Sequence, residues 1–240
     1  MRRRFFVNQF NGHTAIIAGD TAHHLGRVLR AQPGQLYELS DGQHVRLGRI
    51  EKVARDRVEF VLLDDIPSHE PKLEVALLLS VVKFEAFEWA IEKATELGVS
   101  TIIPLAAERS EKALLAAATK RAERWNKILV EASQQSRRVR VPALQTVAQP
   151  AQAFTGYDES AVKIMLSERA GALPLNQVLP AASRRTQAIL AIGPEGGWTE
   201  AEFSAAQAGG FREASLGKLI LRTETAVIAA LSSINYALSE

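Results

Sequence analysis

Residues 187–199 read Gln-Ala-Ile-Leu-Ala-Ile-Gly-Pro-Glu-Gly-Gly-Trp-Thr, in which an apolar run passes through a glycine-rich loop. The run is short and bounded by Gly and Pro, which is typical of a buried strand. Thr199 follows the loop and is placed to cap a helix that continues to Ala208. A strand, a short loop and a helix in this order predict an α/β domain.

The same alternation of apolar strand and amphipathic helix continues on both sides of this stretch. Leu73–Val82 is almost continuously apolar, as a buried parallel strand would be, and Phe84–Leu97 has helical spacing that ends at a glycine. Ligands of such domains bind at the carboxyl ends of the strands, so we expect a site in the loops after Leu166, Ile192 and Leu216. The other predicted elements are strands Thr101–Leu105, Val162–Leu166, Gln187–Ile192 and Glu213–Leu216 and helices Lys120–Gln135 and Thr223–Leu238.

The segment from Arg4 to Asp65 has a different pattern, in which short apolar runs alternate with turn sequences such as Asp41-Gly42. This predicts a small β-barrel or sandwich with one helix, Thr21–Leu29, capped by Asp20. The polar stretch Ile66–Pro71 contains two prolines and is interpreted as a linker. The expected strands are Phe5–Val7, Thr14–Ala18, Leu36–Leu39, Val45–Ile50 and Val58–Leu63.

Composition excludes several kinds of chemistry. The chain has 240 residues and no cysteine, so disulfides, thiolate metal sites, iron–sulfur clusters and a cysteine nucleophile are ruled out. No stretch approaches the roughly 18 uncharged apolar residues of a membrane span, and the start at Met1–Arg4 lacks the apolar run of a signal peptide. We therefore expect a soluble, cytoplasmic protein without a membrane partner.

The formal net charge is only +2, but the basic residues are unevenly distributed. One group lies near the N-terminus and another between Lys120 and Arg140. Arginine pairs with phosphate through two parallel hydrogen bonds, so these groups favour binding to phosphate or nucleic acid. The alternative is a solvated helix face with ordinary Arg–Glu pairs, and charge alone does not decide between them.

Two motifs carry candidate chemistry. In Gly193–Gly197 the glycines let the backbone approach a ligand closely; the motif is neither a Walker loop nor a dinucleotide fingerprint, and a turn built only for geometry is the alternative. In Leu216–Ala226 an apolar strand end runs into a polar quartet that opens the last helix. Helix capping explains the threonines and Glu224. Arg222 is left over, and it is suited to bind an anion or to stabilise developing negative charge.

These two motifs resemble signatures of the RsmE family, the S-adenosylmethionine-dependent 16S ribosomal RNA uridine N3-methyltransferases of the SPOUT superfamily. The chain departs from the family pattern at Lys83–Ala86, where the family usually has Lys-Gly-Asp-Lys/Arg, and at Gln134–Arg138, where it usually has Glu-Gln-Ser-Gly-Arg. No role is therefore transferred to Lys83 or Gln134. Further matching segments are His24–Arg30 with Pro33-Gly34, Glu92–Val99, Glu108–Ser110, Arg124-Trp125 and Ala132–Arg138.

The resemblance implies a PUA-like, RNA-binding β-barrel over residues 1–68 and a SPOUT methyltransferase domain with a parallel sheet over residues 72–240. It also implies that the chain of the second domain is threaded into a trefoil knot near its C-terminus. It implies a homodimer that uses S-adenosylmethionine, without a metal, to methylate N3 of a specific uridine in 16S rRNA. That uridine is expected near the decoding site, on the assembled small ribosomal subunit rather than on naked RNA. The last helix is apolar on more than one face, which suits a dimer, although burial in the core explains it equally well.

The resemblance places the cofactor in the three strand-end loops, and the implied chemistry and the charge pattern suggest the other site residues. Arg222 is expected to stabilise the uracil anion, and Glu224 to accept the N3 proton, with Glu195 as its rival. Each glutamate has a structural alternative: Glu224 a favourable charge at a helix start, Glu195 a hydrogen bond that braces the loop. The expected cofactor-binding residues are Leu166, Ser167, Ile192, Gly193, Pro194, Glu195, Gly196, Gly197, Leu216, Gly217, Leu219 and Leu221. The residues expected to contact RNA phosphates are Arg2, Arg3, Arg4, Arg27, Arg30, Arg137 and Arg138.

Two other functions remain open at this point. A SPOUT enzyme that methylates another position, such as a ribose 2′-hydroxyl, would share these cofactor loops, because the loops do not name the acceptor atom. A non-catalytic RNA-binding protein of ribosome assembly would use the fold as a scaffold. The glycine loops, Arg222 and Glu224 argue against a scaffold, which has no evident use for close backbone approach to a ligand.

Overall fold

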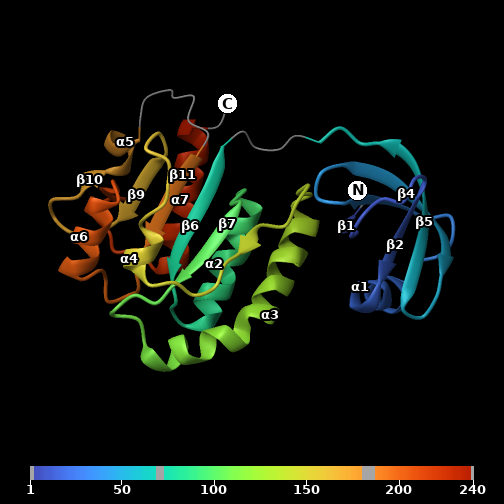
Figure 1. Cartoon of the computed structure of the whole chain (residues 1–240), viewed down its shortest axis with the longest axis horizontal. Helices are drawn as coiled ribbons and strands as arrows, with labels where there is room; N and C mark the ends of the chain where they lie inside the picture. The colour runs from blue at the N-terminus through green and yellow to red at the C-terminus, as the bar shows by residue number, and fades with distance from the viewer. Residues whose placement is uncertain (1–2, 69–72, 180–186, 239–240) are drawn as a thin grey trace. The chain divides into compact units, whose positions relative to one another are not determined.

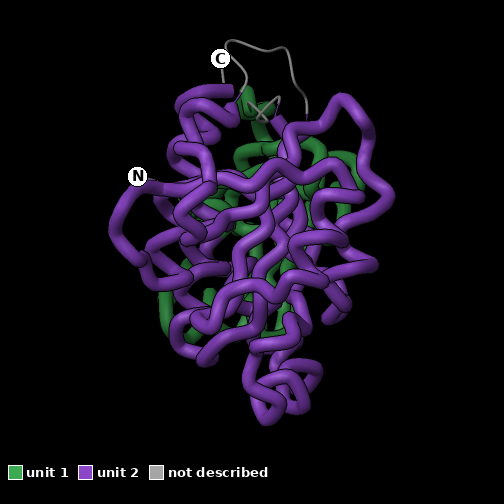
Figure 2. The backbone as a smooth tube through the Cα atoms, turned by 90° about the vertical axis from the view of Figure 1, so that its left-hand side faces the viewer, with its two compact units in different colours: residues 1–70, 133–141 green, residues 71–132, 142–240 purple. Residues whose placement is uncertain are grey.

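The computed structural model describes residues 3–68, 73–179 and 187–238. The chain divides into two compact units, one of residues 1–70 and 133–141 and the other of residues 71–132 and 142–240 (Figure 2). The first unit is therefore built from two separate stretches of the chain. The expected boundary near residue 70 did not include the second of these stretches.

Among the described residues, the first unit holds a five-stranded sheet in the order β1-β3-β4-β5-β2. β1 pairs with β3 in parallel, and the other pairs are antiparallel. A Cβ atom on Gly48 would lie 2.6 Å from the Leu39 side chain, so any larger residue there would displace this buried leucine. The strands are β1 (Arg4–Phe6), β2 (Thr14–Ala18), β3 (Leu36–Ser40), β4 (Val45–Val53) and β5 (Arg57–Asp65).

The helix of this unit differs from the prediction. It begins at Gly19, two residues before the expected start, as α1 (Gly19–His23) and continues as a π-helical turn, η1 (His24–Val28). Gly19 has φ +67°, which lets the chain turn from β2 directly into the helix. Asp20 consequently lies in the first turn, and the N-cap is Ala18, which makes no side-chain capping bond. The prediction of an Asp20 cap is wrong.

Residues 133–141 are fastened to β1 and β3 by hydrogen bonds. The Arg4 guanidinium donates to the carbonyl oxygen of Arg137, and the Ser40 hydroxyl donates to the carbonyl oxygen of Val139. Arg4 also forms a buried ion pair of 2.9 Å with Glu38, which lies 3.5 Å from Arg137 as well. The basic stretch that follows helix α3 (Lys112–Gln135) is thus part of the first unit.

The second unit is built on a parallel sheet, which in the described residues has seven strands in the order β10-β12-β9-β11-β6-β7-β8. Figure 1 shows β6, β7, β9 and β11 side by side, as their pairings require. The strands are β6 (Glu74–Ser80), β7 (Thr101–Leu105), β8 (Ala143–Leu144), β9 (Val162–Leu166), β10 (Leu173–Pro174), β11 (Gln187–Ile192) and β12 (Arg212–Ser215). The helices are α2 (Phe84–Glu96), α3 (Lys112–Gln135), α4 (Pro150–Ala153), α5 (Leu175–Val178), α6 (Glu200–Ala208) and α7 (Thr223–Leu238).

Side chains that alternate along the central strands pack on opposite faces of the sheet, against different helices. Ala76, Leu78, Ile189 and Ala191 join a buried cluster with residues of α4 and α6, while α2 packs against α7. Because side chains alternate across a strand, both faces of the sheet are covered, which explains the nearly unbroken apolar runs in β6 and β11. The mixed α/β architecture with a parallel sheet is confirmed.

The remaining differences concern short or alanine-rich segments. α3 begins at Lys112 rather than Lys120, because the alanine-rich stretch 113–118 is helical, as the high helix propensity of alanine favours. The short elements β8, α4, β10 and α5 were not predicted. The trefoil knot implied by the family resemblance stays a prediction. Among the described residues, no helix is long and apolar enough to cross a membrane.

Candidate active site

The loops that follow β9, β11 and β12 line a pocket of about 540 Å³, here called the three-loop pocket. These strands are neighbours in a parallel sheet, so their carboxyl ends lie at the same edge. The pocket is where the strand-end argument predicts a ligand. Of the twelve expected cofactor-binding residues, all but Gly196 line it.

The glycine-rich loop 193–198 is held in place from two sides. The indole Nε1 of Trp198 donates to the carbonyl oxygen of Leu166 at 3.0 Å, which ties this loop to the end of β9. The guanidinium of Arg109 donates to the carbonyl oxygen of Gly196 at 2.8 Å. A Cβ atom on Gly193 would lie 3.0 Å from the Trp198 indole, so the close approach of backbone and ring favours glycine at this position.

Gly196 has a different environment from its neighbours. A Cβ atom built on it would lie 3.2 Å from the Cβ of Arg109, and Gly196 lines an adjacent hollow that also contains Lys83 and Glu111. Gly196 therefore does not line the three-loop pocket itself, but it contacts Arg109, which does. Gly197 has φ +68°, a conformation that favours glycine.

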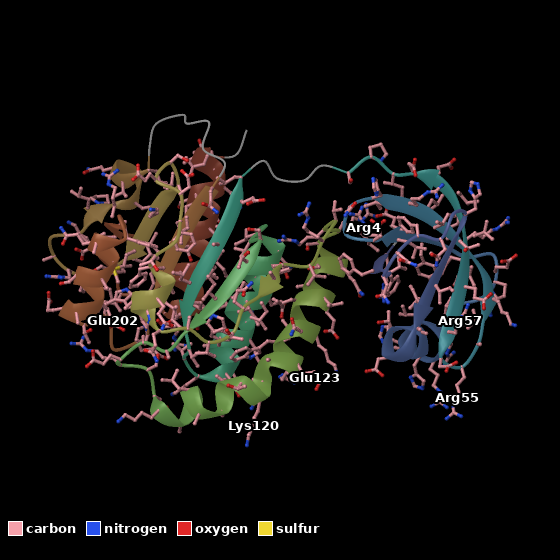
Figure 3. All side chains as sticks on the ribbon, viewed as in Figure 1. Arg4, Arg55, Arg57, Lys120, Glu123 and Glu202 are labelled. Carbon is pink, nitrogen blue, oxygen red and sulfur yellow. The ribbon has the colours of Figure 1, made fainter. Side chains whose placement is uncertain are left out.

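A buried carboxylate connects this loop with the loop that carries Arg109. Glu202, labelled in Figure 3, is 7% exposed. Its Oε1 accepts a hydrogen bond from the backbone N–H of Glu108 at 3.0 Å, and its Oε2 accepts one from the N–H of Thr199 at 2.8 Å. Thr199 in turn caps α6 in a capping box, as predicted. One side chain thus fixes the start of α6 and the position of the 106–110 loop.

The third loop, residues 216–222, is much more open. Leu219 is 82% exposed and Ile220 is 79% exposed. The Ser215 hydroxyl donates a hydrogen bond to the carbonyl oxygen of Gly217 and accepts one from its N–H. Gly217 has a φ of +129°. Apolar side chains with this exposure line one wall of the three-loop pocket.

A second hollow, the side pocket, adjoins the three-loop pocket. Glu195, Arg222 and Thr223 line both, whereas Glu224 lines only the side pocket. The Arg222 side chain makes no hydrogen bond or ion pair with any residue that the structure describes, and the same holds for the Glu195 and Glu224 carboxylates. Glu224 lies in the first turn of α7, as its structural alternative requires. The structural alternative for Glu195 requires a hydrogen bond that braces the loop, and no described residue forms one with its carboxylate. The full lining of the side pocket is Lys83, Glu85, Ala86, Trp89, Glu195, Arg222, Thr223, Glu224 and Thr225.

Several residues of the three-loop pocket could not be assigned a role from the sequence. Arg109 belongs to a stretch that resembles the family but gave no indication of its role, and Trp198 was noted only as part of the loop. The guanidinium of Arg169 lies 4.4 Å from the centre of the Phe203 ring, and it also pairs with Glu200 at 3.4 Å. These contacts join segments far apart in the chain, so no local spacing predicts them.

The candidate RNA-contacting residues fall into distinct groups. Arg3, Arg27 and Arg30 are exposed on the first unit, and Arg30 has the unusual φ of +50°. Arg4, labelled in Figure 3, is only 6% exposed and is paired with Glu38, so its burial removes it from the phosphate-binding set. Arg2 lies outside the described residues. Arg137 and Arg138 are half-buried within the first unit.

Helix α3 supports the alternative interpretation of its basic residues. Arg121 and Arg124 both pair with Glu88, at 3.4 and 2.8 Å, and Lys127 pairs with Glu123 at 3.2 Å. Lys120 and Glu123 project outward from the helix (Figure 3). The Glu88 side chain belongs to α2 and is only 12% exposed, so two of these pairs join α3 to α2 and only the Lys127 pair lies on a solvated face. The middle of α3 therefore offers little unpaired charge for nucleic acid.

Comparison with known proteins defines the family. A model of the RNA methyltransferase domain family matches residues 69–235, and a model of the RNA methyltransferase PUA domain matches residues 17–63. Ribosomal RNA small subunit methyltransferase E of Synechocystis is 36% identical over 89% of this chain and 70% of its own length. The enzyme of the same name from Bacillus subtilis is 32% identical over 93% of this chain and 90% of its own length. The chain belongs to the RsmE family.

The solved structures agree with this assignment. The crystal structure of ribosomal RNA small subunit methyltransferase E from Neisseria gonorrhoeae, bound to S-adenosylmethionine, has a TM-score of 0.89 and 29% identity. The matched region spans 100% of this chain and 99% of the N. gonorrhoeae chain. The first unit is accordingly PUA-like, and the second has the SPOUT methyltransferase fold. Among the described residues, no His, Asp and Glu side chains gather in a group that could hold a metal ion.

Proposed function

We propose that the chain transfers a methyl group from S-adenosylmethionine to N3 of a specific uridine in 16S rRNA. The observation that carries this proposal is the wall shared by two pockets. Glu195 and Arg222 line both the three-loop pocket and the side pocket, so a donor in the first would face an acceptor in the second across these residues. A methyl transfer needs donor and acceptor to be aligned in this manner.

The three-loop pocket suits the cofactor. Its volume of about 540 Å³ is of the size of small-molecule sites, and its walls combine aliphatic side chains with backbone groups of the glycine-rich loop. The N. gonorrhoeae relative was solved with S-adenosylmethionine bound. The cofactor supplies an activated methyl group, so the protein itself needs to position the acceptor and to manage its charge and proton.

The acceptor nitrogen of uracil carries a proton that must leave before or during transfer. Arg222 has a guanidinium without a described partner, and it is suited to hold the carbonyl oxygens of uracil as negative charge develops on them. Glu224 and Glu195 both line the side pocket and are the candidates for accepting the proton, directly or through a water molecule. Glu195 also lines the donor pocket, whereas Glu224 lines the side pocket alone.

The substrate is the small ribosomal subunit, with the target uridine near the decoding site, and the enzyme acts in the cytoplasm as a homodimer. The PUA-like unit would dock on RNA backbone through Arg3, Arg27 and Arg30, assisted by Arg137 and Arg138. The names of the relatives, which refer to ribosomal RNA of the small subunit, support this substrate. Light scattering tests the homodimer, and a monomer in solution contradicts it.

Product analysis tests the reaction. Small subunits from a strain that lacks the enzyme are incubated with the purified protein and S-adenosylmethionine, and their nucleosides are analysed by mass spectrometry. We expect N3-methyluridine. A 2′-O-methylated nucleoside would replace the proposal with methylation of a ribose hydroxyl, and cofactor binding without any product would contradict catalysis of either kind. Failure to bind S-adenosylmethionine in calorimetry would leave the scaffold function.

A separate measurement tests the RNA surface. Replacement of Arg3, Arg27 and Arg30 together by alanine should weaken binding to the small subunit and flatten its salt dependence, by a slope of about one for each phosphate that is no longer neutralised. Arg57→Ala is the matched control, because Arg57 is exposed on the same unit but is paired with Glu59 at 2.8 Å. An unchanged salt dependence in the triple variant would remove these arginines from the interface.

A further inference from the structure

Trp89 is an aromatic side chain that the fold does not need in its core. The chain has three tryptophans, of which Trp125 is 1% exposed and Trp198 is 5% exposed, whereas Trp89 is 44% exposed. The buried face of α2 is already formed by other residues: Phe87, Ala90, Ile91, Ala94 and Thr95. Trp89 therefore lies outside the packed face of its own helix.

The position of Trp89 in the fold gives it a functional setting. It lines the side pocket, a hollow of about 740 Å³, together with Arg222, Glu195 and Glu224. Ala86 lies three residues before Trp89, on the same side of the helix, and lines the hollow too. Its small side chain leaves the region beside the indole ring open to the pocket.

The lining of the side pocket has the chemistry of a nucleobase site. Bases taken out of a helix or loop are held by stacking on an aromatic ring and by hydrogen bonds to their polar edge. The side pocket offers one aromatic ring, one guanidinium and three carboxylates, those of Glu85, Glu195 and Glu224, and none of these charged groups has a partner among the described residues. Lys83 is exposed at the same hollow, and its charge suits the phosphate that accompanies a nucleotide.

We propose that the side pocket is the subsite for the extruded base of the RNA and that Trp89 is the ring on which this base stacks. Stacking there would present the edge of the base to Arg222 and Glu195, the residues shared with the three-loop pocket. Trp89 is then a binding residue for the acceptor, with no part in holding the methyl donor. This inference rests on the proposed function.

The test compares Trp89→Ala, Trp89→Phe and Tyr236→Ala. Tyr236 is 93% exposed and lines a different hollow, so it controls for the loss of any exposed aromatic ring on the second unit. Methyl transfer to unmodified small subunits gives kcat/KM, calorimetry gives the affinity for S-adenosylmethionine, and filter binding with S-adenosylhomocysteine present gives the affinity for the subunit. Light scattering gives the oligomeric state.

Trp89→Ala should lower kcat/KM for the subunit by roughly 5- to 100-fold and weaken subunit binding, because stacking of one base contributes about that much. Its affinity for S-adenosylmethionine and its oligomeric state should match those of the wild type. Trp89→Phe, which keeps a stacking ring, should recover most of the loss, and Tyr236→Ala should behave as the wild type.

Three results would overturn the inference: full transfer by Trp89→Ala, equal losses in Trp89→Ala and Trp89→Phe, or a change of oligomeric state in Trp89→Ala. The last of these would assign Trp89 to a contact between two copies of the chain. A failure of the proposed function is seen separately, because the wild type would then make no N3-methyluridine.

Discussion

Two of the loops that line the three-loop pocket, residues 193–198 and 216–222, are built in opposite ways. Loop 193–198 is anchored by Trp198 and Arg109 through hydrogen bonds of 3.0 and 2.8 Å. Loop 216–222 exposes Leu219 and Ile220 by 82% and 79%. One wall of the pocket is therefore formed before any ligand arrives, while the other presents apolar side chains that a ligand or a partner would cover.

This difference suggests a division of labour within the pocket. A preformed wall lowers the ordering cost of binding, and an open wall lets a ligand enter and leave. Arg222 stands at the end of the open loop, immediately before the buried Thr223 that starts α7. The predicted anion-stabilising group is thus attached to the adaptable wall, next to a fixed helix.

The largest expected effect comes from removal of this group. Arg222→Ala should lower the rate of methyl transfer by about 10²- to 10³-fold, the usual cost of losing one donor that stabilises transition-state charge. The affinity for S-adenosylmethionine, measured by calorimetry, should stay within a few fold. Arg222→Lys keeps the charge without the planar fork and should recover only part of the rate. Normal turnover by the alanine variant would remove Arg222 from the mechanism.

A substitution in the anchored loop should instead impair cofactor binding. Gly193→Ala places a methyl group 3.0 Å from the Trp198 indole, so the ring must shift by a few tenths of an ångström, which strains its hydrogen bond with Leu166. We expect the affinity for S-adenosylmethionine in calorimetry to fall by roughly tenfold to 100-fold, the scale of 1–3 kcal/mol for an overpacked site. Gly171→Ala is the matched control, because a Cβ atom there meets nothing within 4 Å.

Gly196 sharpens this prediction. A side chain there would press on Arg109 rather than on Trp198, so Gly196→Val should disturb the Arg109 anchor first.

The Gly193→Ala prediction has a clear contradicting outcome. If this variant binds the cofactor with wild-type affinity, the anchored wall is not preformed in the way that its hydrogen bonds indicate.

The anchored wall should also contribute to stability. Glu202→Ala leaves the N–H groups of Glu108 and Thr199 without their buried acceptor, which costs about 1–3 kcal/mol. Thermal unfolding should therefore start several degrees lower. Glu200→Ala is the control, since Glu200 lies in the same helical turn but is exposed and forms only a surface pair with Arg169. Equal stability of the two variants would show that Glu202 does not anchor the loop.

The sequence predicted the open wall and the strands and helices around the site better than it predicted the side chains that hold the anchored loop in place. β9, β11 and α7 have the bounds that apolar runs and caps indicated, and Thr199 caps α6 as expected, because these features depend on neighbouring residues. Arg109 and Glu202 contact residues 87 and 94 positions away along the chain. No periodicity or spacing records such contacts, so they had to be observed.

Arg4 shows the same limit for charged residues. Its sequence neighbours Arg2 and Arg3 made it a candidate for phosphate binding, because composition shows only the charge of a side chain. In the fold Arg4 is buried and forms an ion pair with Glu38. A basic cluster in sequence therefore predicts charge, while the availability of that charge depends on carboxylates brought close by the tertiary structure.

The smallest expected effect concerns the exposed side chains of the open wall. Leu219→Ser with Ile220→Ser should change the free energy of unfolding by no more than about 0.5 kcal/mol, because both side chains are already in contact with solvent. If S-adenosylmethionine covers them, its affinity should fall by about threefold to tenfold, since the variant has less apolar area for binding to bury. Hydrogen exchange should show protection of residues 216–222 on cofactor binding and little change in residues 193–198.

Two outcomes of that experiment would reverse the contrast between the walls. Equal protection of both loops by the cofactor would mean that the anchored wall is as adaptable as the open one. Unchanged cofactor affinity together with a shift from dimer to monomer in light scattering would mean that Leu219 and Ile220 are covered by a second copy of the chain. In that case the open wall would be completed by the homodimer, and Arg222 would be positioned by the partner's approach as well as by the start of α7.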